Sequence, residues 1–427
     1  MPRNGDFRRL VDTDRGLVSR RIFVDEDLYQ GELKHIFARC WLYLCHDSQL
    51  AKPGDYMTTY MGEDPMLVIC DPAGRIRAFL NSCRHRGMRI CRSDSGNARV
   101  FNCPYHGWSY DNAGKLAGVP RFEAGYKGEL DRDQWGLLEV AQLDSYKGTV
   151  WATWDKSAQP LTSYLGGMTT YFDMVVDRMD GGLECVGGVH KWTIDANWKF
   201  AADNFVGDMY HVPVTHRSNN ALGLRKPWGD EGYQINPGNG HGFGGEFGGL
   251  AEGAVAATAY TPFVKAMRAR LAEEKGDVVN KIVPIGHGTI FPNFSFLDTL
   301  RFRTFRVWHP RGPNKMEIHA WCMVDKNLPE NLKREVRAQY IFTFGPSGMF
   351  EQEDGENWSQ CTSSTRGWIG RQLDFNYQMG LHHEKPVSEG LQKDLPGQMG
   401  GIWSEINQRG FYQRWADLMI AGERDGG

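Results

Sequence analysis

Two short segments of the sequence each combine one cysteine with one histidine. "CRH" carries Cys83 and His85, and "CPYH" carries Cys103 and His106. A packed core has no need of a histidine beside each cysteine, whereas thiolates and imidazoles are common ligands of transition metals. We expect both segments to lie at the tips of β-hairpins, where two loops bring the four side chains to one metal centre.

The distribution of the ligands over the two segments indicates which metal they bind. Zinc fingers usually group cysteine with cysteine and histidine with histidine. A Rieske [2Fe–2S] cluster instead has one iron held by two cysteines and the other by two histidines, which raises its reduction potential. One ligand of each kind per segment therefore favours a Rieske cluster, an electron carrier. The alternatives are a structural zinc site and loop residues that bind no metal.

A second polar group follows in "NWKFAADNFVGDMYHVPVTH". The apolar spacing predicts a helix from Asp195 to about His211, ended by Pro213, which lacks the N–H that a continuing helix needs. On that helix Asn204, Asp208 and His211 would share one face. Buried polar groups must be paired or bound to a metal, so this stripe is a candidate metal site.

His216 follows just after the predicted helix, where the turned chain can bring it beside His211. Two histidines and one carboxylate form the facial triad of non-heme Fe(II) sites, which leaves coordination positions open for O₂. The carboxylate must come from elsewhere in the chain. The stretch "FGPSGMFEQEDGENW" offers Glu351, Glu353 and Asp354, and we expect it to form a helix after the turn "GPSG".

The surrounding pattern predicts an α+β protein of three parts. Residues 41–155 read as short strands between turns and form a small all-β domain. Residues 156–427 contain strands such as "RFRTFRVWHP" and "MEIHAWCMV" together with helices, and form the larger α+β catalytic domain. We expect the N-terminal segment 1–40 to pack with that domain. The glycine-rich residues 236–250 have no hydrophobic period and are interpreted as a lid or a surface loop.

Composition excludes several kinds of partner. With 49 basic and 52 acidic residues, the chain has no electrostatic footprint for nucleic acid or an anionic membrane. No stretch is long and apolar enough to span a bilayer, and the N-terminus lacks a signal-peptide pattern. The nine cysteines are an odd number without regular spacing, which is typical of reduced thiols. We therefore expect a cytoplasmic protein with a small-molecule ligand.

Taken together, "CRHRG", "CPYHGW" and the downstream histidines resemble the large (alpha) subunit of bacterial Rieske non-heme iron aromatic-ring-hydroxylating dioxygenases, the naphthalene and biphenyl dioxygenase type. The resemblance implies a Rieske domain followed by a catalytic domain with an antiparallel sheet of the helix-grip, START-like kind. It also implies that Asp354 is the third ligand of a mononuclear Fe(II). Many relatives have two aspartates here, so Glu353 remains a second candidate.

The same resemblance implies the reaction and the partners. Such a terminal oxygenase cis-dihydroxylates an aromatic hydrocarbon or aromatic acid with O₂ and electrons from NAD(P)H. The sequence has no convincing nucleotide-binding fingerprint, so a separate reductase, with or without a ferredoxin, must supply the electrons. A small beta subunit and an alpha3beta3 or alpha3 assembly are expected. Two alternatives remain: a Rieske monooxygenase like the salicylate hydroxylases and O-demethylases, and an electron-transfer or metal-binding protein with an inactive second site.

Family position also implies roles for further residues. The substrate pocket is expected to include Asn204, Phe205, Val212, Phe294, Phe344 and Phe350. Asp208 is expected to accept a hydrogen bond from a Rieske histidine of the neighbouring subunit, corresponding to His106, in a ring of three. Independently of the family, Arg217 and Arg225 are either contacts for a substrate carboxylate, because guanidinium binds planar anions in a bidentate manner, or surface residues. The sequence does not decide between a hydrocarbon and an acid.

Overall fold

The chain divides into two compact units, each with its own strands. The computed structural model describes residues 7–223, 229–246, 260–276, 286–299 and 302–425. The large unit comprises Met1–Ile36 and Thr162–Gly427, and the small unit comprises Phe37–Leu161. The small unit is almost entirely β and the large unit is α+β, which confirms the predicted fold class.

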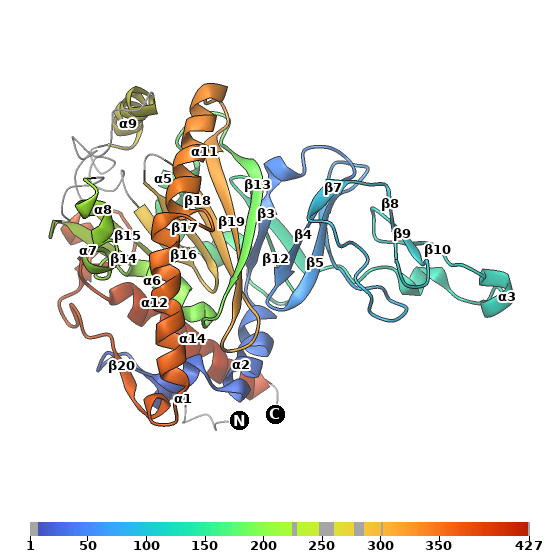
Figure 1. Ribbon diagram of the computed structural model, residues 1–427, viewed down its shortest axis with the longest axis horizontal. Coiled ribbons are helices and arrows are strands. Elements are labelled where there is room, and N and C mark those ends of the chain that lie inside the picture. Colours follow the sequence, from blue (N-terminus) through green and yellow to red (C-terminus); the bar gives the residue numbers. More distant parts are fainter. Residues whose placement is uncertain (1–6, 224–228, 247–259, 277–285, 300–301, 426–427) are drawn as a thin grey trace. The chain divides into compact units, whose positions relative to one another are not determined.

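The small unit is built from three antiparallel sheets (Figure 1), in the strand orders β6-β5-β4-β7, β10-β9-β8 and β11-β12-β3. Its elements are β3 (Leu42–His46), β4 (Asp55–Met61), β5 (Asp64–Cys70), β6 (Ile76–Leu80), β7 (Ser95–Asn97), β8 (Val100–Asn102), β9 (Ser109–Asp111), β10 (Leu116–Gly118), α3 (Phe122–Tyr126), β11 (Gln142–Tyr146) and β12 (Thr149–Thr153). Most of β5 and all of β12 are buried, which explains their nearly continuous apolar sequences.

One hydrophobic cluster of the small unit underlies the two cysteine–histidine segments. It contains Leu67 and Ile69 from β5 and Phe79 from β6, together with Cys83 and Cys103 themselves. Both cysteines are only 3% exposed. The loops that carry the four predicted ligands are therefore fixed to a core at their cysteine ends.

The large unit has a nine-stranded antiparallel sheet with helices on both faces, and a small separate sheet in the strand order β1-β2-β20. Its first elements are α1 (Phe7–Leu10), β1 (Val11–Asp12), β2 (Leu17–Ser19), α2 (Glu26–Glu32), α4 (Leu161–Leu165), α5 (Met168–Val176), β13 (Leu183–Ile194), α6 (Trp198–Gly207), α7 (Val212–Thr215), α8 (Arg217–Ala221), β14 (Gly232–Gly238), β15 (His241–Glu246) and α9 (Tyr260–Lys275). The others are β16 (Gly286–Ile290), β17 (Phe294–Asp298), β18 (Arg303–Pro310), β19 (Met316–Asp325), α11 (Glu330–Phe344), α12 (Met349–Arg366), β20 (Asp374–Asn376), β21 (Lys385–Pro386), α13 (Val387–Gly390), β22 (Gln398–Gly401) and α14 (Ile406–Asp425).

The strands of this sheet follow the order β13-β19-β18-β17-β16-β15-β14-β22-β21 among the described residues. Helix α6 packs on β15 to β18, and α14 packs on α6, β14 and β15. Helix α5 covers the opposite face, where Phe172 contacts Phe294, Phe296 and Phe305. Successive strand residues point to opposite faces, so β18 presents Arg306 toward α6 and Phe305 toward α5.

The glycine-rich residues are not the irregular loop that the sequence predicted. Residues 236–238 end β14, residues 239–240 form a turn and residues 241–246 form β15, which pairs with β14; residues 247–250 lie outside the described residues. Gly242 leaves room for α6, and Gly244 leaves room for a side chain of the neighbouring strand β14. A Cβ on Gly242 would lie 2.6 Å from Val206 Cγ2, and one on Gly244 would lie 2.1 Å from Gln234 Oε1. Packing requires small residues at these positions, and such a requirement leaves no hydrophobic period in the sequence.

The N-terminal segment is anchored by a buried ion pair within the large unit. Glu32 at the end of α2 accepts hydrogen bonds from Lys199 Nζ (2.6 Å), Trp198 Nε1 (2.9 Å) and Trp415 Nε1 (2.8 Å). Glu32 and Lys199 are both fully buried. These bonds join α2 to α6 and α14. In the part of the chain that the structure describes, no helix is long and apolar enough to cross a membrane.

Candidate metal centres and active site

The two cysteine–histidine loops of the small unit have the same backbone design. The Cys83 N–H donates to the carbonyl of Met88 (2.8 Å), and the Gly87 N–H donates back to the Cys83 carbonyl (2.8 Å). In the second loop the Cys103 N–H donates to the carbonyl of Trp108 (2.7 Å). Gly87 has a φ of 72°, and the glycine at the same place in the second loop has 75°, a backbone conformation that favours glycine.

This geometry brings the predicted ligands of the two loops together. The rings of His85 and His106 lie 4.6 Å apart between centroids, in an edge-on arrangement. His85 also stacks on Trp108 at 5.0 Å. Its Nδ1 is buried without a hydrogen-bond partner, as expected for a nitrogen that ligates a metal. Burial, with the nearby His106 and Arg86, lowers the pKa of His85, so its imidazole is neutral, as ligation requires.

A tyrosine that the sequence analysis missed contacts one of the cysteines. The Tyr110 hydroxyl accepts a hydrogen bond from the Arg84 N–H (3.1 Å) and lies 3.4 Å from Cys83 Sγ. A hydroxyl has a single proton, so that proton points toward the sulfur. Burial raises the pKa of Tyr110, which keeps the hydroxyl protonated. Its only sequence signal was its position two residues after Trp108.

One of the two loops differs from the prediction. "CPYH" lies in the β8–β9 hairpin, in which Asn102 pairs with Ser109. "CRH" does not lie at a hairpin tip: it follows β6 and leads to β7, which are separated in the sheet by β5 and β4. A tight loop closed by its own backbone hydrogen bonds gives the same local sequence pattern as a hairpin, so the two could not be distinguished.

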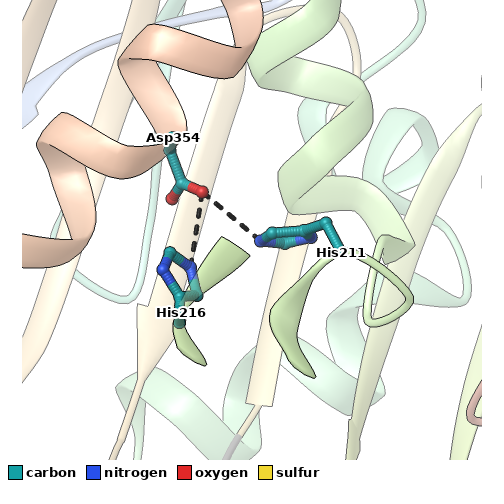
Figure 2. Close-up of side chains that lie close together, drawn as sticks. All are labelled: His211, His216 and Asp354. Carbon is teal, nitrogen blue, oxygen red and sulfur yellow. Dashed lines mark ion pairs between the residues drawn. The ribbon is translucent and has the colours of Figure 1, made fainter. Parts of the chain in front are cut away.

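In the large unit, ligand atoms of three residues lie within 4.8 Å of one another: His211, His216 and Asp354. Figure 2 shows both rings directed at the same carboxylate oxygen: Asp354 Oδ1 lies 3.4 Å from His211 Nε2 and 3.3 Å from His216 Nε2. Asp354 is 2% exposed, and its Oδ1 has no hydrogen-bond partner. Three inward-facing donors of this kind, with an orphaned carboxylate oxygen, fit a cation.

The histidines are positioned by turns and not by one long helix. Helix α6 begins at Trp198 and ends at Gly207, and the side chain of the preceding Asn197 caps it by accepting from the Lys199 N–H (3.0 Å). The prediction of a helix to about His211 was wrong. The chain leaves the helix because the Asp208 carboxylate accepts the His211 N–H (3.1 Å), which replaces a helical bond.

Pro213 therefore does not end the helix. It lies in the first turn of the short helix α7, where a missing N–H costs nothing. His211 and His216 are the residues that flank α7 on either side. One helical turn between them places their rings 5.2 Å apart, which brings both histidines to the carboxylate of α12.

Carboxylates other than Asp354 fix the orientation of the two rings. His216 Nδ1 lies 2.8 Å from Glu353 Oε2, and Glu353 Oε1 accepts from the Ser218 hydroxyl. His211 Nδ1 lies 3.2 Å from Asp208 Oδ2. Each ring thus presents Nδ1 to a supporting carboxylate and Nε2 to Asp354. This is the arrangement in which an outer carboxylate orients a ligating histidine.

The electrostatics of the site favour a positive ion at the point where the donors meet. Burial by itself would lower the pKa of His211, but Asp208 and Asp354 outweigh it and raise that pKa to about 10. Burial also raises the pKa of Glu351, one helical turn before Asp354, to about 7, although Arg306 opposes the shift. A position that retains a proton so strongly is one where a divalent cation can replace it.

The expected pocket residues fall into two groups. Phe205 lies in the last turn of α6, Val212 begins α7, Phe344 ends α11 and Phe350 lies in the first turn of α12. The Phe350 ring lies 4.8 Å from that of His216 and 5.3 Å from that of Phe344. Asn204 also belongs to this group, because its Nδ2 lies 3.3 Å from His211 Nδ1.

Phe294 is not brought into this group. It lies on β17 with its ring toward Phe305 and α5, on the face of the sheet opposite α6. The alternation along the strand places its neighbour Ser295 toward α6 instead, where Ser295 contacts Thr289 (2.8 Å). The resemblance matched the position of Phe294 but gave no information on which face it occupies.

Two arginines were considered as contacts for a substrate carboxylate. Arg217 is exposed, and Arg225 lies outside the described residues. The sequence analysis missed the buried pair of Arg306 and Glu351 beside the site, and it missed His287. The His287 Nδ1–H donates to the Phe205 carbonyl (2.9 Å). None of these residues has a local motif that identifies it.

Comparison with known proteins identifies both units. The Rieske [2Fe–2S] domain family model matches residues 40–145, and the ring hydroxylating alpha subunit (catalytic domain) model matches residues 183–421. The chain is 41% identical to the biphenyl dioxygenase subunit alpha of Paraburkholderia xenovorans, covering 97% of this chain and 93% of that protein. It is also 41% identical to the benzene 1,2-dioxygenase subunit alpha of Pseudomonas putida, covering 98% and 95%.

Solved structures give the same result. Naphthalene 1,2-dioxygenase from Rhodococcus sp., crystallised with indole, superposes with a TM-score of 0.86 at 38% identity and 98% coverage of both chains. A quaternary ammonium Rieske monooxygenase superposes with a TM-score of 0.70 at 18% identity, over 95% of this chain and 96% of that one, which shows a shared fold only.

Proposed function

Because the chain belongs to the family of ring-hydroxylating dioxygenase alpha subunits, we propose that it cis-dihydroxylates an apolar aromatic hydrocarbon at the His211–His216–Asp354 site. The cluster of these three ligands is the observation that carries the proposal. Written in full, the aromatic substrate, O₂, two electrons and two protons give a cis-dihydrodiol that contains both oxygen atoms.

The class of enzyme follows from the family. The chain is the terminal oxygenase subunit of a multicomponent dioxygenase, an oxidoreductase that uses a Rieske cluster and a mononuclear iron. Electrons reach it from NAD(P)H through separate electron-transfer proteins. When bound, the cluster supplies single electrons and the iron supplies open coordination positions for O₂. The protein contributes ligands, orientation and an apolar pocket.

In the proposed iron site, His211 Nε2, His216 Nε2 and Asp354 hold the metal. Glu353 was the second candidate for the carboxylate ligand, but its contacts with His216 Nδ1 and Ser218 suit a supporting role. It keeps the proton of His216 on Nδ1 and leaves Nε2 free for the metal. Asp208 does the same for His211.

In the proposed cluster site, Cys83 and Cys103 hold one iron and His85 and His106 hold the other. The cysteines are rooted in the core and the histidines lie at the surface side of the loops, with His106 exposed. An exposed histidine edge suits electron exchange with another protein. The small unit would thus be the electron-carrying domain, and the large unit, with residues 1–36, the catalytic domain.

The proposed pocket consists of Asn204, Phe205, Val212, Phe344 and Phe350. Four of these side chains are apolar, which favours a flat hydrocarbon and excludes water from the ring. Arg306, a buried cation nearby, is already paired with Glu351 and hydrogen-bonded to a backbone carbonyl. A substrate carboxylate would have no free buried partner among these residues, so a hydrocarbon is preferred over an aromatic acid.

Family resemblance supplies the proposed assembly. Asp208 would accept a hydrogen bond from His106 of a neighbouring subunit in a ring of three and so link the two metal sites. Its side chain is 32% exposed, which leaves it open to a second partner beside His211. A beta subunit, a ferredoxin or reductase as electron donor, and a cytoplasmic location near NAD(P)H belong to the same proposal. Asp208→Asn should keep both metals and the oligomer while electron transfer between the centres slows.

The deciding experiment is turnover of a panel of aromatic hydrocarbons and acids by the reconstituted enzyme under ¹⁸O₂. A cis-dihydrodiol with two labelled atoms supports the proposal. One labelled atom in a phenol would identify the monooxygenase alternative. A protein that binds both metals but forms no product with any aromatic would instead be an electron-transfer or metal-binding protein, and a colourless zinc protein would contradict both assignments.

A further inference from the structure

A buried arginine lies beneath the proposed pocket. Arg306 is on β18, has no exposed surface and faces the same side of the sheet as α6. Its Nη1 forms an ion pair with Glu351 Oε2, and its Nη2 donates to the Phe344 carbonyl (2.7 Å). These two contacts hold the Nη1 and Nη2 ends of the guanidinium, while its Nε is buried without a hydrogen-bond partner.

The guanidinium also contacts the aromatic side chains of the pocket. Its central carbon lies 5.2 Å from the centroid of the Phe205 ring and 5.2 Å from that of Phe344. Cation–aromatic contacts are stronger where water is excluded, as it is here. Phe344 in turn contacts Phe350, whose ring lies 4.8 Å from that of His216. A continuous set of contacts therefore leads from Arg306 to a proposed iron ligand.

Arg306 thus connects the segments that make up the iron site. Phe205 belongs to α6, which precedes His211. Phe344 closes α11, and Glu351 lies one turn before Asp354 on α12. The strand that carries Arg306 belongs to the sheet, the most extensively paired part of the large unit. A single side chain on that sheet thus contacts two pocket rings and the helix that carries the carboxylate ligand.

We propose that Arg306, through its ion pair with Glu351 and its contacts with Phe205 and Phe344, is a positioning residue that sets where the substrate ring lies relative to the iron. The inference rests on the proposed function and deepens it. It makes the buried pair a determinant of regiochemistry and of the share of consumed O₂ that reaches product. When the ring is misplaced, the same two electrons and two protons reduce O₂ to hydrogen peroxide without oxidising the substrate.

The test uses a paired substitution. Removing Arg306 alone leaves the Glu351 carboxyl group buried without its partner, which destabilises the fold. The double variant Arg306→Met/Glu351→Met removes both charges together and replaces them with side chains of similar length, which proteins often tolerate. Arg306→Lys keeps the charge but loses the planar fork. The matched control is Arg303→Lys on the same strand, because Arg303 is also buried and paired, with Asp298 and Asp325, on the opposite face.

The measurements use the complete enzyme and a monosubstituted benzene, whose ring edges are inequivalent. We expect the double variant to keep its iron and its Rieske spectrum, while the ratio of dihydrodiol isomers changes by about fivefold and product per O₂ falls by about threefold, because a displacement of about 1 Å is enough to lose alignment. Arg306→Lys should fall between the double variant and the wild type, and Arg303→Lys should match the wild type.

A measurement without turnover accompanies these. The electron-spin signal of the nitric oxide adduct of the iron senses an aromatic ring beside the metal. Its response to the added substrate should differ between wild type and double variant. An unchanged response, isomer ratio and product per O₂ in an iron-loaded double variant would overturn the inference, as would loss of its iron.

The remaining outcomes are also decisive. If the double variant does not fold, Arg306→Lys decides, and a wild-type isomer ratio in that variant overturns the inference. An equal change in Arg303→Lys would show that any buried pair has this effect and would overturn it as well. If the wild type converts no aromatic compound, the proposed function fails and this inference fails with it, whereas a failure of the inference alone leaves wild-type turnover intact.

Discussion

The two metal-binding regions of the molecule are assembled in different ways. Two neighbouring loops of the small unit carry the cluster ligands Cys83, His85, Cys103 and His106. Each loop is closed by its own backbone hydrogen bonds, and its cysteine belongs to one core cluster. The triad of the large unit depends on distant contacts, since His216 and the supporting Glu353 are 137 residues apart in sequence. The first site is a local structure, whereas the second exists only when α6, α7 and α12 are packed together.

The charges around the two regions differ as well. The cluster site is supported by a neutral donor, the Tyr110 hydroxyl near Cys83. The iron site is surrounded by ionisable groups, among them Asp208, Glu353 and the buried pair of Arg306 and Glu351. A neutral hydrogen bond changes the reduction potential of a cluster by a small amount, whereas buried charges determine whether a metal cation binds.

The largest effect should follow from removal of the shared carboxylate. Asp354→Ala removes the oxygen on which both histidines converge, so we expect loss of the mononuclear iron and a fall in turnover of more than about 1000-fold. The Rieske absorption and electron-spin signals should be unchanged, because their ligands lie in the other unit. Iron analysis and product formation measure the result. If Asp354→Ala stays active and Glu353→Ala does not, the assignment of the two carboxylates is reversed.

A smaller effect is expected at the supporting carboxylate. Glu353→Gln keeps the shape but weakens the bond that orients His216, and loss of such a partner typically lowers metal affinity by about 10–100-fold. Competition with a chelator measures the iron affinity. The exposed Glu356 of the same helix is a matched control, and Glu356→Gln should bind iron as the wild type does. Equal affinity in Glu353→Gln and wild type would contradict the supporting role.

The concentration of buried charge in the large unit predicts a pH effect at Asp203. Burial raises its pKa to about 7, although Tyr377 and Tyr412 donate hydrogen bonds to it. Because the folded pKa lies above the unfolded value, the stabilising contribution is complete below about pH 4 and is lost as pH rises through 7. We therefore compare the free energy of unfolding of Asp203→Asn with that of the wild type at each pH. The difference should favour the variant by about 1–2 kcal/mol more at pH 8 than at pH 5.

Denaturant unfolding at the two pH values checks this result. The control is Asp144→Asn in the small unit, where the side chain is exposed and no such difference is expected. If Asp203→Asn shows the same pH dependence as the wild type, the charge of Asp203 does not contribute to the alkaline loss of stability.

The smallest effect is expected at Tyr110. Reduction adds negative charge to the cluster, so the hydrogen bond from the hydroxyl to Cys83 is stronger in the reduced state. Tyr110→Phe should lower the midpoint potential by about 40 mV, since about 60 mV corresponds to a tenfold change for one electron. Spectroelectrochemistry measures it. Tyr56→Phe is the control, because that hydroxyl contacts Cys91, which is not a ligand. A potential equal to the wild type would exclude a tuning role.

The same contrast explains what the sequence could predict. The cluster ligands could be predicted because the short spacing of cysteine and histidine within each segment is enough to specify them. His211 and His216 were found in one segment too, but the helix assigned to them was too long, because the turn at Gly207 and Asp208 depends on a side chain capping a backbone N–H. The prediction that "EQEDGENW" forms a helix after "GPSG" is confirmed by α12.

Long-range partners were beyond the reach of the sequence. Arg306 and Glu351 are 45 residues apart, and neither residue carries a motif that names the other. Phe294 was assigned to the pocket by position, yet the face of a strand is decided by the sheet as a whole. The glycines at 242 and 244 were interpreted as a loop, because the contacts that require them, with Val206 of α6 and Gln234 of β14, leave no local sequence pattern.

The ends of the small unit have a consequence for modular exchange. The indole of Trp41 donates to the Gln159 carbonyl (2.8 Å), and the Thr153 hydroxyl donates to the Arg39 carbonyl (3.2 Å). These bonds join the first residues of the small unit to its last residues. It is inserted in the large unit as a cassette whose two termini are already adjacent. Exchange of residues 37–161 between relatives would therefore introduce a Rieske domain with a different reduction potential. The buried ion pair between Glu32 and Lys199 would be kept, because both residues lie outside the exchanged segment.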